Sequence, residues 1–148
     1  MRLTNYSDYA LRLLMYVAAK RNSYVTIGEV ARAYGISKNH LMKIAHHLAL
    51  EGILKTARGR NGGLCLAKPA AEINIGRVMR LLEASSPLVE CFDPATNTCV
   101  ITDTCSLKHV LRYALEDFFK RLDQYSLADL AVDRNKFSTL IVVETKDR

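Results

Sequence analysis

Three cysteines, Cys91, Cys99 and Cys105, lie within fifteen residues of each other. An odd number of clustered thiols cannot all pair as disulfides, and in a reducing compartment such clusters more often bind metal or act in redox chemistry. Seven residues separate the first two cysteines and five the second two. Zinc sites usually contain a tighter pair. A [4Fe–4S] cluster is larger and tolerates these separations, so we expect an iron–sulfur cluster, most simply [4Fe–4S], with [2Fe–2S] as the alternative.

Three thiolates leave one iron of a four-iron cluster without a protein ligand. His109 follows Cys105 by four residues, and Asp93 and Asp103 lie inside the cysteine-bearing segment, so each is a local candidate. Cys65 lies far upstream between two leucines, where a cysteine behaves as a small hydrophobic residue.

The positive charge is concentrated in the first half of the chain. The whole chain has a net charge of +6; residues 1–62 contain ten Lys and Arg against three Asp and Glu (+7), and residues 63–148 contain eleven against twelve (−1). Local basicity of this kind suits a surface that faces DNA phosphates, although a well-solvated surface would also explain it.

The elements that would position these residues read as a winged helix-turn-helix. Apolar spacing and capping residues predict three helices, at residues 6–20, 27–34 and 38–51. Thr26 and Glu29 have capping-box spacing, Gly35 ends the second helix, and Ser37 is expected to cap the third. Two strand candidates, residues 53–57 and 63–67, flank the turn that contains Asn61 and form a hairpin, the wing.

Further helices are expected on both sides of the cysteine segment. Helices are predicted at residues 75–83, 106–122 and, as one short piece, 126–130. We therefore expect a mainly α protein with a small β-hairpin. Its predicted domains are a DNA-binding domain at 1–85, a cluster-binding loop at 86–105, a dimerisation helix with the short helix at 106–132, and a tail at 133–148. A homodimer is expected because two half-sites of a palindromic operator need two recognition helices.

The residues expected to contact DNA lie on the third helix and on the wing. A recognition helix enters the major groove by its first turns, where Asn, Lys, Ser and His side chains can reach base edges or phosphates, and arginines on a narrow wing suit the minor groove. The candidates are Ser37, Lys38, Asn39, His40, Lys43, Arg58, Arg60 and Asn61. Leu41, Met42, Ile44 and Leu48 are expected to face the core.

The whole chain resembles the NsrR-type nitric-oxide-sensing repressors of the iron–sulfur winged-helix family that also includes IscR. The resemblance is carried by M-R-L-T-N-Y-S-D-Y-A-L-R, Y-G-I-S-K-N-H-L-M-K-I, R-G-R-N-G-G, the three cysteines and L-D-Q-Y-S-L-A-D-L. It implies that Cys91, Cys99 and Cys105 hold the cluster and that Asp8 of the other subunit is the fourth ligand. The IscR branch has its histidine ligand at the position of Lys108, so the resemblance favours Asp8 over His109. Without a cluster, Asp8 would simply favour the helix start and pair with Arg12.

The function implied is a cytoplasmic DNA-binding repressor that releases its operator when nitric oxide attacks the cluster. Two alternatives stay open: a regulator of the same family that senses iron or cluster status, and a thiol-redox or zinc-structured regulator without a cluster. We expect no enzymatic activity, since no phosphate-binding loop, zinc-hydrolase motif or nucleophile elbow is present, and no association with a membrane.

Overall fold

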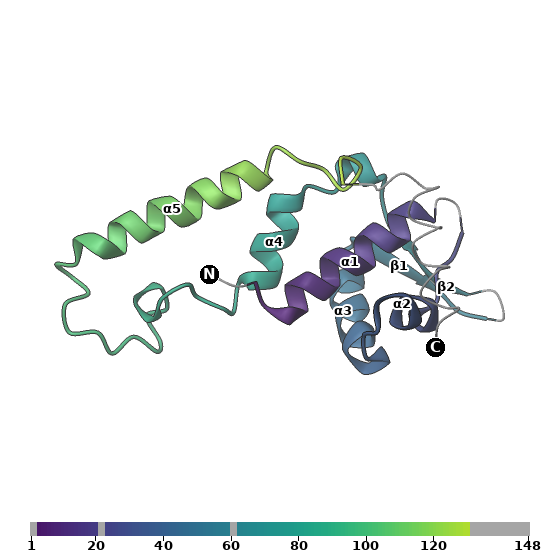
Figure 1. Ribbon diagram of the computed structural model, residues 1–148, viewed down its shortest axis with the longest axis horizontal. Coiled ribbons are helices and arrows are strands. Elements are labelled where there is room, and N and C mark those ends of the chain that lie inside the picture. Colours follow the sequence, from purple (N-terminus) through teal and green to yellow (C-terminus); the bar gives the residue numbers. More distant parts are fainter. Residues whose placement is uncertain (1–2, 21–22, 60–61, 131–148) are drawn as a thin grey trace.

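The computed structural model describes residues 3–20, 23–59 and 62–130. Its helices and strands are α1 (Asn5–Ala19), α2 (Ile27–Tyr34), α3 (Lys38–Leu50), β1 (Leu54–Ala57), β2 (Gly63–Leu66), α4 (Ile75–Glu83) and α5 (Ser106–Leu122), with short 3-10 helices at Ala70–Glu72 and Glu90–Phe92. Helices α1 to α4 and the hairpin form a compact body, from which α5 and the segment before it extend (Figure 1). The mainly α fold with one hairpin is the predicted one.

The core lies where α1, α2, α3, α4 and the hairpin meet. Fully buried side chains come from each of these elements, including Leu13 and Leu14 of α1, Val30 of α2, Leu41, Ile44 and Leu48 of α3, Leu54 of β1 and Met79 of α4. Within α1 and α3 the buried residues recur at helical spacing, which is why these segments fold into amphipathic helices that share one apolar centre.

The turn between α2 and α3 is built as the sequence predicts, except for the cap of α3. Thr26 and Glu29 form a reciprocal capping box at the start of α2. Gly35 follows α2 with φ 64°, a left-handed conformation that glycine adopts without steric cost. Ser37 occupies the position before α3, but its side chain makes no capping hydrogen bond, so that part of the prediction is wrong.

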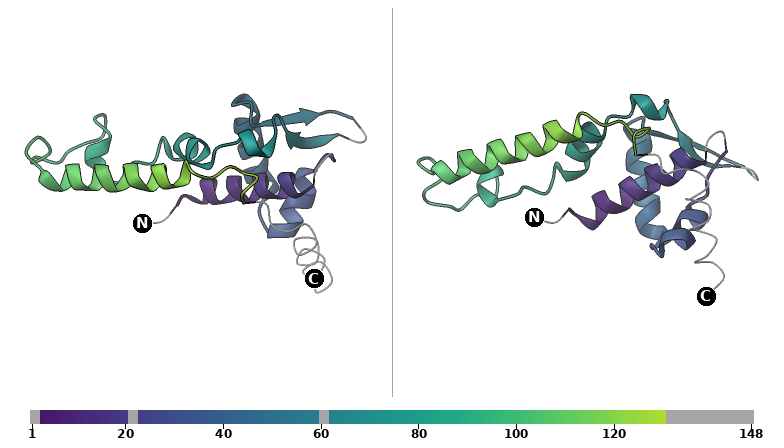
Figure 2. Two further views of the ribbon diagram at one scale, coloured as in Figure 1. Left: turned by 90° about the horizontal axis from the view of Figure 1, so that it is seen from above. Right: turned by 45° about the horizontal axis from the view of Figure 1, so that its top comes forward.

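The hairpin is a two-stranded antiparallel sheet with Leu54 opposite Leu66 and Ala57 opposite Gly63. An isolated bridge between Val25 and Leu64 ties it to the segment before α2. The two further views show the hairpin projecting from the body on the side away from α5 (Figure 2). This is the wing expected of a winged helix.

The end of α5 is joined to the start of α4. Arg80 of α4 makes a bidentate ion pair with Asp123, at 2.6 and 2.7 Å, and Asn74 donates to the Asp123 carbonyl. Ser126 forms an isolated bridge with Asn74, and the Leu127 N–H donates to the Ile73 carbonyl at 2.8 Å. The short helix predicted at 126–130 is therefore wrong, because this extended pairing and a following turn replace it.

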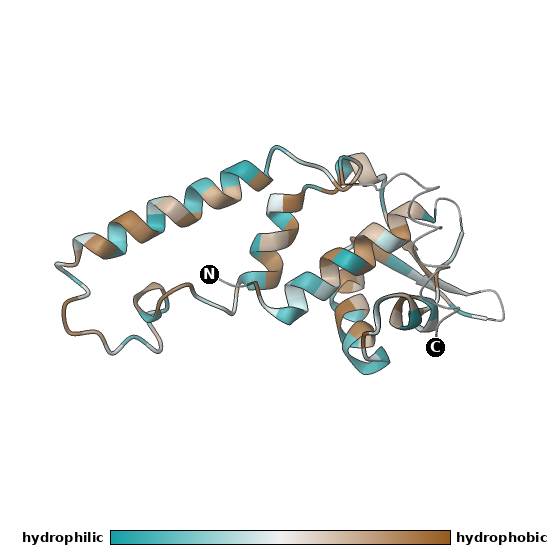
Figure 3. Cartoon of the chain, viewed as in Figure 1, coloured by the Kyte–Doolittle hydropathy of each residue, from teal (hydrophilic) through white to brown (hydrophobic). Residues whose placement is uncertain are grey.

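Helix α5 packs on the body only at its C-terminal end. Phe119 and Leu122 lie against the core, whereas no α5 residue is fully buried, and Leu107, Val110 and Tyr113 are more than 60% exposed. Apolar segments recur along the whole helix, including the part far from the body (Figure 3). Among the helices of residues 3–20, 23–59 and 62–130, none is both long and apolar enough to cross a membrane.

Candidate cluster site and DNA-binding surface

The three clustered cysteines lie on the segment that connects α4 to α5. Cys91 is in the 3-10 helix Glu90–Phe92, Cys99 precedes a turn, and Cys105 is the N-cap residue of α5. All three thiols are free and partly buried. No residue from 84 to 105, a stretch described throughout, is fully buried. The segment therefore has no packed core of its own to hold one conformation.

Local hydrogen bonds shape this cysteine loop. The Asp93 carboxylate accepts from the Ala95 N–H and the Thr96 hydroxyl, at 3.0 and 2.8 Å. The Asn97 side chain accepts from the Cys99 N–H at 3.1 Å, and the Thr102 hydroxyl donates to the Cys99 carbonyl at 2.8 Å. The Asp93 side chain thus stabilises a turn, which favours a structural role for Asp93 over metal binding.

The loop does not bring the thiols together as a closed metal site. Within the described part of the chain, no three His, Cys, Asp or Glu side chains are gathered closely enough to hold a metal ion. His109 is exposed in the first turn of α5. The chemistry of the donors nevertheless suits an iron–sulfur cluster, because three unpaired thiols share one loop without a packed core.

Asp8 lies in the first turn of α1, which Thr4 caps. Its carboxylate binds the Arg12 guanidinium one turn later through two contacts, at 2.8 and 3.1 Å, and its side chain is 42% exposed. Thr4 also connects this turn to α4: its N–H and hydroxyl donate to Glu83, at 3.1 and 3.0 Å. Glu83 immediately precedes the cysteine loop, so the Asp8 turn and the loop are attached to the same end of α4.

The opposite side of the α1 start contacts α3. The Tyr6 hydroxyl lies 3.0 Å from His47 Nδ1, and the Tyr9 ring lies 6.3 Å from the His40 ring. Burial raises the pKa of Tyr6, so its phenol stays protonated at neutral pH. The helix that bears Asp8 therefore packs directly on the predicted recognition helix.

The first turn of α3 presents the predicted DNA-contacting residues to solvent. Ser37, Lys38, Asn39, His40 and Lys43 are all exposed. Met42 is 51% exposed, so its predicted core position is wrong, whereas Leu41, Ile44 and Leu48 are buried. Helix periodicity explains the difference, since Met42 follows Leu41 by one position and lies about 100° around the helix from it. Met42 thus joins the exposed side of α3.

Arg58 is exposed at the end of β1, where the wing begins to turn. The adjacent Gly59 has φ 109°, a conformation that side-chain-bearing residues rarely adopt. Arg60 and Asn61, the other two predicted wing contacts, lie outside the described residues.

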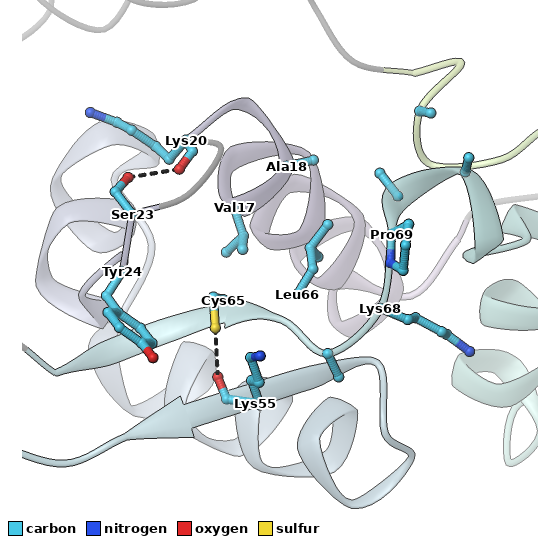
Figure 4. Close-up of a pocket in the computed structure, with 14 residues that line it drawn as sticks. Val17, Ala18, Lys20, Ser23, Tyr24, Lys55, Cys65, Leu66, Lys68 and Pro69 are labelled. Carbon is cyan, nitrogen blue, oxygen red and sulfur yellow. Dashed lines mark hydrogen bonds between the residues drawn. The ribbon is translucent and has the colours of Figure 1, made fainter.

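The fourth cysteine lies apart from the cysteine loop. Cys65 is on β2 and lines a surface cavity of about 690 Å³ between the end of α1, the hairpin and the segment after it (Figure 4). Its thiol donates a weak hydrogen bond to the Lys55 carbonyl, with a sulfur–oxygen distance of 3.9 Å. Lys20, Lys55 and Lys68 line the same cavity.

The sequence model of the Rrf2 family, described as an iron-dependent transcriptional regulator, matches residues 3–133. The chain belongs to the Rrf2 family. It is 47% identical to the HTH-type transcriptional regulator NsrR of Oceanobacillus iheyensis over 97% of this chain and 99% of that protein. It is 45% identical to the NsrR of Bacillus subtilis over 95% of this chain and 97% of that protein.

Two solved structures have the same fold. CymR of B. subtilis, named the global cysteine regulator, superimposes with a TM-score of 0.70 at 23% identity, over 90% of this chain and 99% of that one. T. potens IscR superimposes with a TM-score of 0.69 at 23% identity, over 88% of this chain and 85% of that one. Membership of this family makes the protein a DNA-binding transcription regulator and not an enzyme.

Several contacts that organise this site were not predicted from the sequence. They include the Thr4–Glu83 bonds and the Arg80–Asp123 pair, whose partners are 79 and 43 residues apart. No local spacing pattern links residues at such separations. Of these contacts, only the role of Thr4 as a helix cap could have been predicted from the sequence, since threonine before an apolar helix is a common N-cap.

Proposed function

We propose that this protein is a homodimeric repressor that holds an iron–sulfur cluster and releases a palindromic operator in response to nitric oxide. The observation that carries the proposal is the set of three free thiols on one loop without a packed core, in a chain 47% identical to a protein named NsrR. The description of the Rrf2 family as iron-dependent supports a role for iron.

The proposed ligands are Cys91, Cys99 and Cys105 of one subunit and Asp8 of the partner subunit. The Asp8 side chain is 42% exposed and so accessible to a second chain. To bind cluster iron, its carboxylate would have to break its ion pair with the Arg12 guanidinium. A carboxylate is a harder and weaker ligand for cluster iron than a thiolate. When bound, a [4Fe–4S] cluster supplies an iron atom at this weak ligand that nitric oxide can attack.

Asp8 is also the residue through which the cluster site can influence DNA binding. Helix α1 carries Asp8 on one side and contacts the recognition helix α3 through Tyr6 and Tyr9 on another. A change in what the Asp8 carboxylate binds would therefore act on the turn of α1 that also contacts α3. We assign residues 1–85 to DNA binding, 86–105 to the cluster and 106–132 to dimerisation; the tail at 133–148 lies outside the described residues.

The exposed apolar side of α5 supports the proposed dimer. Leu107, Val110 and Tyr113 lie three residues apart and share one side of the helix, away from the body. An exposed apolar stripe of this kind is a common interface between subunits. Two subunits joined through α5 would present two recognition helices to two operator half-sites. A cytoplasmic location follows from this proposed role.

The central experiment measures DNA binding and the cluster in the same samples. Protein purified anaerobically should be brown and show the visible absorption of a [4Fe–4S] cluster. It should also bind its promoter fragment. Stoichiometric nitric oxide should bleach the cluster and release the DNA. Cys91→Ser, Cys99→Ser or Cys105→Ser should prevent cluster assembly, Asp8→Ala should make the cluster less stable, and the matched control Cys65→Ser should behave as wild type.

The second candidate is a regulator of iron or cluster status, favoured by the family description. Iron chelation without nitric oxide would then release the DNA as effectively as nitric oxide does. Unchanged DNA affinity after nitric oxide treatment of the brown protein would refute nitric oxide sensing. A colourless protein that binds DNA equally well would support the zinc-structured or thiol-redox alternative.

A further inference from the structure

Gly28 lies in the first turn of α2 beneath two cationic side chains. A side-chain carbon added at Gly28 would lie 3.5 Å from a guanidinium nitrogen of Arg32 and 3.9 Å from the terminal carbon of the Lys38 chain. Arg32 is one turn further along α2, whereas Lys38 is the first residue of α3. The side chains of two cationic residues, one from each helix of the helix-turn-helix, therefore pass close to backbone that carries no side chain.

Both cations are available to an external anion. Arg32 and Lys38 are exposed, and among the residues that the structure describes none forms a hydrogen bond or close ion pair with either charged group. The charge of Arg32 acts on Glu29, but the hydrogen bonds of the Glu29 carboxylate come from the Thr26 N–H and hydroxyl, at 2.7 and 2.9 Å. Glu29 is thus occupied by the capping box and directed toward the start of α2.

We propose that Arg32, Lys38 and the bare backbone at Gly28 form a clamp for one phosphate of the DNA backbone. The proposal rests on the proposed use of α3 as the recognition helix, since Lys38 directly precedes Asn39 and His40. A guanidinium can bind phosphate through two hydrogen bonds, and an ammonium adds a point charge. The missing side chain at Gly28 lets the phosphate approach the backbone, and the clamp sets the depth at which α3 enters the groove.

The test measures affinity for two DNA duplexes, the promoter fragment and a scrambled sequence of equal length, over a range of salt concentrations. Arg32→Ala should weaken binding to both duplexes about tenfold at low salt. It should also reduce the slope of log affinity against log salt by about one per clamp. Arg77→Ala is the matched control, because it removes the same charge from an exposed position on α4. It should change affinity and slope much less.

Gly28→Ala separates the clamp from folding and from net charge. The added methyl group would make only ordinary contacts and alanine favours helix, so the melting temperature should be unchanged or higher. The affinity for both duplexes should nevertheless fall, because the methyl group occupies the space for the phosphate.

Three outcomes would overturn the clamp. The first is unchanged DNA affinity and salt slope in both Arg32→Ala and Gly28→Ala. The second is an equal loss of affinity in Arg32→Ala and Arg77→Ala. The third is a loss of affinity for the promoter duplex but not for the scrambled one. None of them affects the proposed function as long as Asn39→Ala still abolishes promoter preference. If Asn39→Ala and Lys38→Ala also bind the promoter as wild type does, the proposed recognition helix itself is wrong.

Discussion

At the scale of single residues, Gly28 and Gly76 occupy the same position in two different helices. Each is the second residue of its helix, α2 or α4. The surroundings differ. A side-chain carbon at Gly76 would lie 2.8 Å from both the carboxyl carbon and the backbone nitrogen of Asp123, whereas one at Gly28 meets only ordinary contacts. Gly76 is therefore required for the close approach of α4 and the end of α5.

Gly76→Ala should lower the free energy of unfolding by about 1–3 kcal/mol, because Asp123 must move away from the new methyl group. Gly28→Ala is the matched control and should be neutral or stabilising by about 0.5 kcal/mol. Urea unfolding followed by circular dichroism measures both. Equal stability of Gly76→Ala and wild type would mean that the end of α5 shifts without cost.

The lowered pKa of Glu29 predicts that the stability of the fold depends on pH. Burial acts to raise the pKa of Glu29, but hydrogen bonds from Thr26 and the charges of Lys20 and Arg32 outweigh it and hold the pKa below its ordinary value. In the unfolded chain the pKa is about 4.3. The folded state therefore gains stability from the ionised carboxylate above about pH 4.3 and loses it as the pH falls through the folded pKa.

Glu29→Gln should be less stable than wild type at pH 7, and this difference should shrink as the pH falls below about 4.3 and through the lowered pKa of the folded state. Thermal unfolding at several pH values measures the effect, with the exposed Glu72→Gln as control. A constant difference at all pH values would show that ionisation of Glu29 contributes nothing to the fold.

At the scale of elements, α4 connects the DNA-binding body to everything that follows it. Its last residue, Glu83, holds the start of α1 through Thr4, and Arg80, one turn earlier, holds the end of α5 through Asp123. Arg80 also lies 4.9 Å from the centre of the Phe119 ring. The Arg80–Asp123 pair is exposed, so the backbone pairing beside it contributes more to this junction than the charges do.

Thr4→Ala should cost about 1 kcal/mol, because it removes both the α1 cap and the hydroxyl bond to Glu83. Thr4→Ser keeps a hydroxyl at the same position and should retain most of the stability. Chemical unfolding of the two variants side by side tests this tie. Identical losses in both would assign the effect to the missing methyl group and not to the hydroxyl.

At the scale of the whole molecule, the apolar stripe of Leu107, Val110 and Tyr113 on α5 stays exposed to solvent in a single chain. Val110→Glu should convert the proposed dimer to monomer, because dimerisation would bury a charge without a partner. The fold of the single chain should be retained, since Val110 is 61% exposed within it. Analytical ultracentrifugation measures the mass. Lys120→Glu, on an exposed position of the same helix, is the control; a dimeric Val110→Glu would exclude this side of α5 as the interface.

The sequence predicted those elements whose signals are local. Helix α4 is predicted to the residue, and the capping box and the hairpin are confirmed. The predicted helix at 126–130 is wrong because its residues pair with Ile73 and Asn74, about fifty positions earlier. The core position predicted for Met42 is wrong because Met42 lies one position, about 100° around the helix, from the buried Leu41, outside the Leu41–Ile44–Leu48 side that meets the core.

The sequence by itself determined the types of ligand available, the winged-helix order of elements and the basic first half. Thiol chemistry, capping residues and apolar periodicity act over a few positions, so they can be read along the chain. Tertiary structure alone decided that the side chains of Arg32 and Lys38 pass close to Gly28, that Gly76 admits Asp123, and that α1 joins Asp8 to the recognition helix. These depend on contacts between segments whose approach is set by packing of the shared core.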